Sequence, residues 1–350
     1  MNASPSQPHP AEWTETQGLL PSVERDLPAG RHQFHKEQMM AQIREDLRTT
    51  PAVAPVRRNP FLRRAVLLPA LACALAGAVV GGLALAGGGG DGKTSLATGP
   101  ALTTRIGTAD AQGAGQLLDH ISLAAADVSG PGVREDQFLY IASKVASTYP
   151  KTVDDKTTIV SEQLHSRQVW ESPDGRNGWL IEPGNTGEDG ITLAGPNPVS
   201  SAYDRLAKLP TDPDALLRKI YQESDAVRDP EVPRDQAAFV AIGDMLTESY
   251  PPAKLTSALY RAAAAIPGVV AVDDAVDAVG RHGVAVARLD EQSGQRTEWI
   301  FDKKTYAFLG ERSVQVGPSE TFEKGTVTFT VAITQRAVVN EMKEVPGRAG

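Results

Sequence analysis

The sequence has a single cysteine, Cys73, among its 350 residues. One cysteine cannot form a disulfide within the chain, nor can it supply a zinc site built from several cysteines. The folded part must therefore be held together by a hydrophobic core. The stretch after residue 108, roughly 240 residues, is long enough to bury one.

The sequence also lacks the short motifs by which common catalytic sites are recognised. HExxH, GxSxG and SxxK are all absent, and Gly113-Ala114-Gly115 lacks the third glycine of a dinucleotide-binding loop. We therefore predict that the chain is not an enzyme. We assign no catalytic residue, no cofactor and no metal ligand, and an enzyme of unknown class is kept only as an alternative.

Two groups of side chains have the chemistry of metal ligands. His32 and His35 lie three residues apart in a predicted helix, but no cysteine or third histidine stands nearby, so a solvated helix face is the simpler interpretation. Asp273, Asp274 and Asp277 have the oxygen atoms that a cation would need, although acidic turns of this kind are usually just solvated.

Three tryptophans, Trp170, Trp179 and Trp299, are either part of a ligand groove or part of the packing of a sheet. Large aromatic side chains dominate protein cores, so packing is the favoured interpretation.

Basic residues are few in the main part of the chain. Residues 87–350 have a net charge of −10, whereas residues 1–64 have +2. A nucleic-acid-binding domain needs a basic face to neutralise phosphates. The acidic balance therefore argues against a nucleic-acid partner.

Residues 65–86 form a run of 22 residues without a charge. A helix of that length is about 33 Å long, enough to cross a hydrocarbon layer of about 30 Å. Arginines 57, 58, 63 and 64 precede the run, so the positive-inside rule predicts a cytoplasmic N-terminus. We expect a single-pass protein of the cell membrane, in contact with the lipid bilayer through this segment and with its C-terminal domain outside the cell.

Two rival interpretations of this run carry less weight. A cleaved signal peptide starts nearer the N-terminus and has a shorter apolar core. Lipid attachment at Cys73 would need a cysteine at the end of the run rather than within it. Gly77 and Gly81 form a GxxxG pattern that favours close helix packing, although small residues are common throughout this segment.

The predicted organisation has four parts. Residues 1–64 form a cytoplasmic tail, mostly disordered, with a short helix at about 32–48. Residues 65–86 cross the membrane, and residues 87–108 are a flexible Gly/Ser/Thr-rich tether. Residues 109–345 form the extracytoplasmic domain. The tail helix has Met39, Ile43 and Leu47 on one narrow face, which suits either a cytoplasmic protein partner or the membrane surface.

The pattern in the outer domain predicts an α+β fold, in which a curved antiparallel sheet is packed against helices. Residues 326–333 alternate between threonine or alanine and a large apolar residue, as expected for a strand with one face in the core and one face in water. Asp212, Pro213 and Asp214 have the features of a helix start. The expected helices are 109–127, 213–221, 234–249 and 253–265, and the expected strands are 136–148, 156–171, 178–182, 269–273, 283–290, 297–302, 307–316 and 325–336.

Several motifs resemble an uncharacterised family of actinobacterial single-pass membrane proteins that are often encoded beside extracytoplasmic-function sigma factors. The resemblance rests on the arginine-flanked membrane run and on three motifs: the tail residues Leu27, Pro28, Arg31, His32, Lys36 and Glu37; the segment 209–217, LPTDPDALL; and the segment 299–310, WIFDKKTYAFLG. The expected outer domain is also distantly similar to the half-barrels of lipoprotein carriers and envelope-stress sensors. The family implies no catalytic residue.

These observations favour a membrane-anchored extracytoplasmic binding or regulatory protein, linked through its tail to a cytoplasmic partner and to sigma-factor signalling. The alternative is an envelope module that binds lipid or another apolar ligand, which a curved sheet with helices on one face would suit.

Overall fold

The computed structural model describes residues 97–127, 132–153, 156–194, 202–230 and 232–347. The predicted tail, its helix at 32–48 and the apolar run at 65–86 lie outside these residues. Within the described residues, no helix is both long enough and apolar enough to span a membrane.

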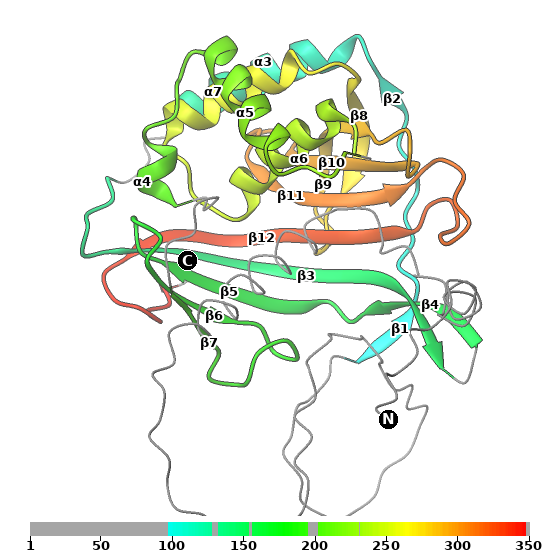
Figure 1. Ribbon diagram of the computed structural model, residues 1–350, viewed down its shortest axis with the longest axis horizontal. Coiled ribbons are helices and arrows are strands. Elements are labelled where there is room, and N and C mark those ends of the chain that lie inside the picture. The colour runs from blue at the N-terminus through cyan, green and yellow to red at the C-terminus, as the bar shows by residue number, and fades with distance from the viewer. Residues whose placement is uncertain (1–96, 128–131, 154–155, 195–201, 231, 348–350) are drawn as a thin grey trace, which may run out of the picture.

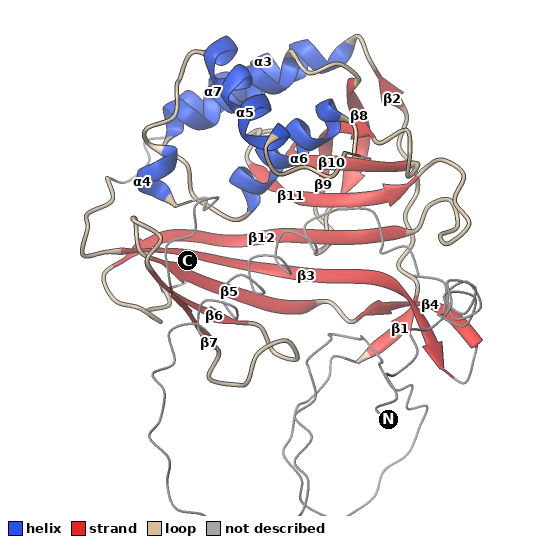
Figure 2. Cartoon of the chain, viewed as in Figure 1, coloured by secondary structure: helices blue, strands red, loops and turns tan. Residues whose placement is uncertain are grey.

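The described part is an α+β fold with one large antiparallel sheet and helices on part of one face (Figure 1, Figure 2), which confirms the predicted fold class of the outer domain. The strands pair in the order β2-β8-β9-β10-β11-β12-β3-β5-β6-β7, and β4 pairs with β3 and with β1. The strands are β1 (Thr98–Pro100), β2 (Ala109–Asp110), β3 (Phe138–Val153), β4 (Lys156–Glu162), β5 (His165–Glu171), β6 (Asn177–Ile181), β7 (Ile191–Ala194), β8 (Val269–Val276), β9 (His282–Leu289), β10 (Gln295–Asp302), β11 (Phe308–Gln315) and β12 (Val327–Val339).

The helices are α3 (Gly113–Asp127), α4 (Tyr203–Leu206), α5 (Pro213–Asp225), α6 (Arg234–Thr247) and α7 (Ala253–Ala264). The predicted start of α5 is confirmed. The Asp212 side chain accepts a hydrogen bond of 2.9 Å from the backbone N–H of Ala215, and Pro213 occupies the first turn.

The main hydrophobic core lies between the helices and strands β8 to β11. The ring of Phe239 in α6 stacks on Trp299 in β10 at 3.9 Å between centroids, and both side chains are fully buried. Tyr260 of α7 meets Phe301 edge-on at 5.4 Å. We call β8 to β11 the helix-covered half of the sheet, and β12, β3, β5 and β6 the distal half.

Two strand predictions need correction. The expected strand at 156–171 is two strands, β4 and β5, because the chain breaks at Gln163 and Leu164 and each piece pairs with a different stretch of β3. In β12 both faces are buried, whereas one wet face was expected. Thr328 and Thr330 are 9% and 5% exposed, and the Thr328 hydroxyl donates to the Gln295 side chain at 2.9 Å.

Residues 97–110, here called the strap, correct the predicted boundary between tether and domain. Residues 97–108 were assigned to a free tether, yet β1 pairs with β4, Thr103 bridges to Thr326, and β2 pairs with β8. The strap runs across the strand ends at one side of the sheet (Figure 1). The domain therefore begins at or before Ala97.

Candidate functional site

A row of apolar side chains crosses the distal half of the sheet on the face that bears the helices. Val145 of β3 lies directly opposite Val331 of β12. Val331 in turn lies opposite Glu311 of β11, and Glu311 lies opposite Trp299 of β10. Directly opposed residues point to the same face of a sheet, so this row shares the face on which α6 rests. We call Ile141, Val145, Val331 and Ile333 the apolar stripe; Phe308 and Phe329 pack against it.

The apolar stripe is shielded from solvent, since its four members are between 3% and 7% exposed. Its packing cluster contains residues of β3, β11 and β12 and no residue of a described helix. The described helices contact the sheet mainly at β8, β9 and β11. The C-terminal end of α6 nevertheless reaches this part of the sheet, because Arg336, opposite Ile141, donates to the Leu246 carbonyl and Arg167 pairs with Glu248.

A chain of charged side chains borders the stripe on β5 and β6. His165 lies opposite Val145, and its Nε2 atom is 3.0 Å from Oε1 of Glu182. The other Glu182 oxygen is 3.3 Å from Nε of Arg167, whose Nη1 is 3.0 Å from a carboxylate oxygen of Glu248. We call these four residues the polar chain. It ties β5 and β6 to Glu248, the residue that ends α6.

The protonation states within the polar chain follow from these contacts. Burial opposes the charge of His165, but its bonds to Glu182 and to the Gln163 carbonyl outweigh burial and raise its pKa. Burial also opposes the charge of Glu182, yet His165 and Arg167 hold its pKa below the ordinary value. The geometry therefore favours an imidazolium paired with a carboxylate.

Two further carboxyl groups lie beside the polar chain. Burial, together with the nearby charges of Glu248 and Asp174, raises the pKa of Glu171 to about 7. Burial also raises the pKa of Glu162, although the backbone N–H of Ser147 donates to its carboxylate at 3.1 Å. Acidic groups thus outnumber the cations Arg167 and His165 at this end of the sheet.

Two of the three carboxylates weighed as a cation site, Asp274 and Asp277, pair with protein cations. Asp277 has a fully buried side chain that lies 2.5 Å from Nε of Arg281, so it is not the solvated side chain that was expected. Asp274 is 3.2 Å from Nδ1 of His282 and 3.6 Å from Nζ of Lys303. Among the described residues, no group of three or more His, Cys, Asp and Glu side chains is arranged to hold a metal ion. His32 and His35 lie outside them.

The three tryptophans serve packing rather than a common groove. Trp299 is fully buried beneath α6. Trp170 and Trp179 face each other across β5 and β6 and belong to a cluster with Tyr140 and Val339 on the opposite face of the sheet. Trp170 is 1% exposed, and its indole N–H donates to the Glu344 carbonyl at 2.7 Å.

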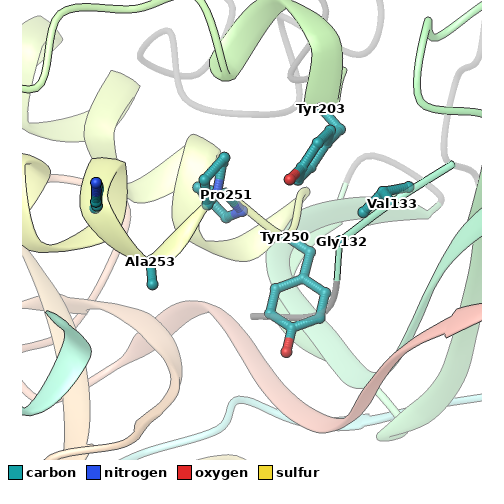
Figure 3. A pocket seen from close by; sticks show the side chains of 8 residues that line it. Gly132, Val133, Tyr203, Tyr250, Pro251 and Ala253 are labelled. Atoms are coloured by element: carbon teal, nitrogen blue, oxygen red, sulfur yellow. The ribbon is translucent and has the colours of Figure 1, made fainter. Parts of the chain in front are cut away.

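One pocket of the described residues lies beside the helices rather than on the sheet. It has a volume of about 210 Å³ and is lined by Gly132, Val133, Tyr203 and residues 250–254 (Figure 3). This is smaller than the roughly 300 Å³ typical of small-molecule pockets. A second hollow of about 410 Å³ follows one surface loop, residues 316–324. Neither hollow lies on the apolar stripe.

No known family model matches the chain, and no curated protein matches it in sequence.

Proposed function

We propose that this protein is a single-pass membrane protein of the cell envelope that binds without catalysis. In this proposal the outer domain binds an elongated apolar ligand, a lipid acyl chain, along the apolar stripe. The observation that supports it most directly is a continuous row of apolar side chains on β3 and β12 whose apolar packing cluster contains no side chain of a described helix. Such a row offers an apolar surface to a ligand when the atoms that shield it move aside.

The position of the domain supports a lipid as that ligand. The uncharged run ends at Ala86 and the strap begins at Ala97. Even fully extended, the intervening residues reach at most about 40 Å. If the run spans the bilayer, the outer domain stays within this distance of the membrane surface, where lipid is the most abundant apolar molecule.

The polar chain limits what can sit at the end of the stripe. His165 is 9% exposed and the Glu182 side chain is 12% exposed, and each is already paired with the other. An apolar chain can lie beside such a satisfied pair, whereas an unpaired charge would cost several kcal/mol there. The proposed ligand therefore places its methylene groups on the stripe and its head group in solvent.

The cytoplasmic tail completes the proposal as the part that reports ligand binding. In this view residues 1–64 meet a cytoplasmic protein, and the family resemblance points to a sigma-factor pathway. A pull-down with the tail that recovers no partner, together with an unchanged transcriptome after deletion of the protein, would contradict this part and leave the lipid-binding part standing.

Lipid binding can be tested on the full chain in vesicles of phosphatidylethanolamine and phosphatidylglycerol that carry a photoreactive acyl chain. After illumination, peptides cross-linked to lipid are mapped by mass spectrometry. We expect cross-links at residues 65–86, which report the membrane segment, and at peptides of β3 and β12. Ile141→Asn should remove the second set, because a buried amide without a partner opposes an apolar ligand. Ile191→Asn, the same change at a half-exposed strand residue, is the control.

Two results would count against the proposal. Cross-links confined to residues 65–86 would leave the stripe without a lipid ligand. A protein–protein cross-link from the stripe to residues 65–86, made with a short bifunctional reagent, would show that the chain itself covers the stripe. Absence of lipid cross-links at residues 65–86 would remove the membrane segment as well.

A further inference from the structure

The strap is held to the sheet by polar contacts rather than by a core of its own. From its membrane-facing end inward, the Ala97 carbonyl accepts from Gln163 N–H at 2.9 Å, and the Leu102 carbonyl accepts from Val327 N–H at 2.8 Å. Between them, Leu102 N–H donates to the Ser161 hydroxyl at 2.6 Å. None of residues 97–110 is buried, and Leu102 is 37% exposed. Little apolar area is therefore lost if the strap separates.

A buried group of three charges holds the centre of the strap. Glu298 of β10 is fully buried; its carboxylate lies 2.8 Å from Nε of Arg296 and 2.7 Å from Nε of Arg312. Arg312 also donates to the Thr104 hydroxyl at 2.9 Å, and Arg296 donates to the Gly107 carbonyl at 3.2 Å. Each guanidinium thus binds the carboxylate and the strap at the same time. We call Arg296, Glu298 and Arg312 the clamp.

The clamp remains complete when the strap leaves. Glu298 keeps both guanidinium partners, so departure of the strap creates no unpaired buried charge, the feature that makes broken ion pairs so costly. The groups released, two guanidinium N–H donors and several backbone amides, can be solvated by water. The strap can therefore detach without unfolding the sheet beneath it.

The fit of the strap depends on Gly107. A Cβ atom at this position would lie 2.5 Å from the Asp273 carbonyl oxygen and 2.7 Å from Cγ1 of Val272. The backbone oxygen cannot move away without disturbing β8. At Gly99, in the same strap, a Cβ atom would meet nothing within 4 Å. The two glycines offer a matched pair of positions, one closely packed and one free.

We propose that the strap is a releasable coupling between the membrane segment and the ligand-binding face, an inference that rests on the membrane anchor of the proposed function. Thr98 pairs with Glu162, and Ala97 accepts from Gln163. Glu162 and Gln163 immediately precede the polar chain at His165, whose Nδ1 is 3.1 Å from the Gln163 carbonyl. Displacement of the strap at its membrane end therefore frees the junction between β4 and β5, where the polar chain begins.

Hydrogen exchange on the full chain in lipid nanodiscs tests this coupling. Gly107→Ala should speed amide exchange in residues 97–108 and 160–165 by about tenfold or more, while exchange in β9 and β10 stays as in the wild type. Gly99→Ala should match the wild type throughout. Thr104→Val, which removes the hydroxyl that accepts from Arg312 and adds no clash, should give a smaller change in the same two segments.

Three outcomes would overturn the proposal. Faster exchange across the whole sheet in Gly107→Ala and also in Thr104→Val would show that the strap is an integral part of the fold. Unchanged exchange of residues 97–108 in both variants would show that neither contact holds it. Release of the strap without faster exchange at residues 160–165 would break the link to the polar chain. The wild type and the variants are compared in the same nanodiscs, and the readout is amide exchange rather than lipid cross-linking, so a failure of lipid binding is distinguished from a failure of this proposal.

Discussion

The two halves of the sheet bury the side chains of their strands with different kinds of contact. In the helix-covered half, Trp299 and Phe301 meet aromatic side chains of α6 and α7, and the result is one large apolar core. In the distal half, a short apolar stripe is bordered by His165 and Arg167, which pair with Glu182 just after β6 and with Glu248 at the end of α6. On the face that bears the helices, apolar contact supplies stability in the first half. In the second, charged groups are retained because each has a partner.

The same contrast separates the parts suited to a fixed core from those suited to function. A closely packed core has one arrangement and resists change. Polar contacts at the edge of a sheet can be exchanged for contacts with water or a ligand at modest cost. The distal half and the strap, rather than the helix-covered half, are therefore the places to look for binding and for movement.

The largest expected effect comes from removing the central side chain of the helix-covered half. Trp299→Ala should lower the free energy of unfolding by about 3–5 kcal/mol, because it deletes a fully buried indole and leaves a cavity beside Phe239. Urea unfolding followed by circular dichroism measures the loss.

The matched variant in the distal half is Trp179→Ala. This indole is half-buried; it donates to the Asp189 carbonyl at 2.8 Å and lies 3.6 Å beneath the ammonium of Lys343. We expect a loss of about 1 kcal/mol, since a partly exposed ring loses less transfer energy and leaves no closed cavity. Equal losses at the two tryptophans would contradict the difference between the halves.

A further prediction is that the free energy of unfolding depends on pH through a glutamate of the distal half. Burial holds the pKa of Glu171 at about 7 in the folded state, compared with an ordinary value of 4.5 for a solvated glutamate. Between these values the folded state binds more protons than the unfolded state. The contribution of Glu171 to the free energy of unfolding is therefore fully present below pH 4.5 and is lost as the pH rises through 7. The change is at most about 3 kcal/mol.

Glu171→Gln should abolish this dependence and raise the free energy of unfolding at pH 8, because the neutral amide needs no proton to stay buried. The measurement is urea unfolding of both proteins at pH 5 and pH 8. Glu188→Gln, which removes an exposed glutamate near β7, controls for the change in net charge. A variant as sensitive to pH as the wild type would assign the effect to another group.

The sequence predicts the local elements of this fold well, because their signals lie within a few residues. Asp212 and Pro213 mark the start of α5, and the alternation in residues 326–333 marks β12. The break between β4 and β5 escapes prediction because Gln163 and Leu164 have no turn signal comparable to a proline or a glycine.

The candidate site is not predictable in the same way, because it is assembled from distant parts of the chain. Arg167, Glu182 and Glu248 come together only through strand register and the docking of α6. The contact between Arg296 and the Gly107 carbonyl of the strap likewise joins distant parts of the chain and is visible only in the structure. The strand pattern in the sequence predicts on which face of the sheet a side chain lies, but it does not predict which distant residues that side chain contacts.

The smallest expected loss of stability comes from changes at the start of α5, in the helical layer. Asp212→Ala should lower the free energy of unfolding by about 1 kcal/mol, because the N–H of Ala215 loses its side-chain acceptor at the start of α5. Asp214→Ala, in the same first turn, removes only a favourable charge near the helix end and should cost a few tenths of a kcal/mol. Neither change should alter hydrogen exchange in the strap, since α5 contacts α6 and α7 rather than residues 97–110. Faster exchange of the strap in Asp212→Ala would mean that the helical layer and the strap are coupled, and the two halves could then no longer be treated as independent.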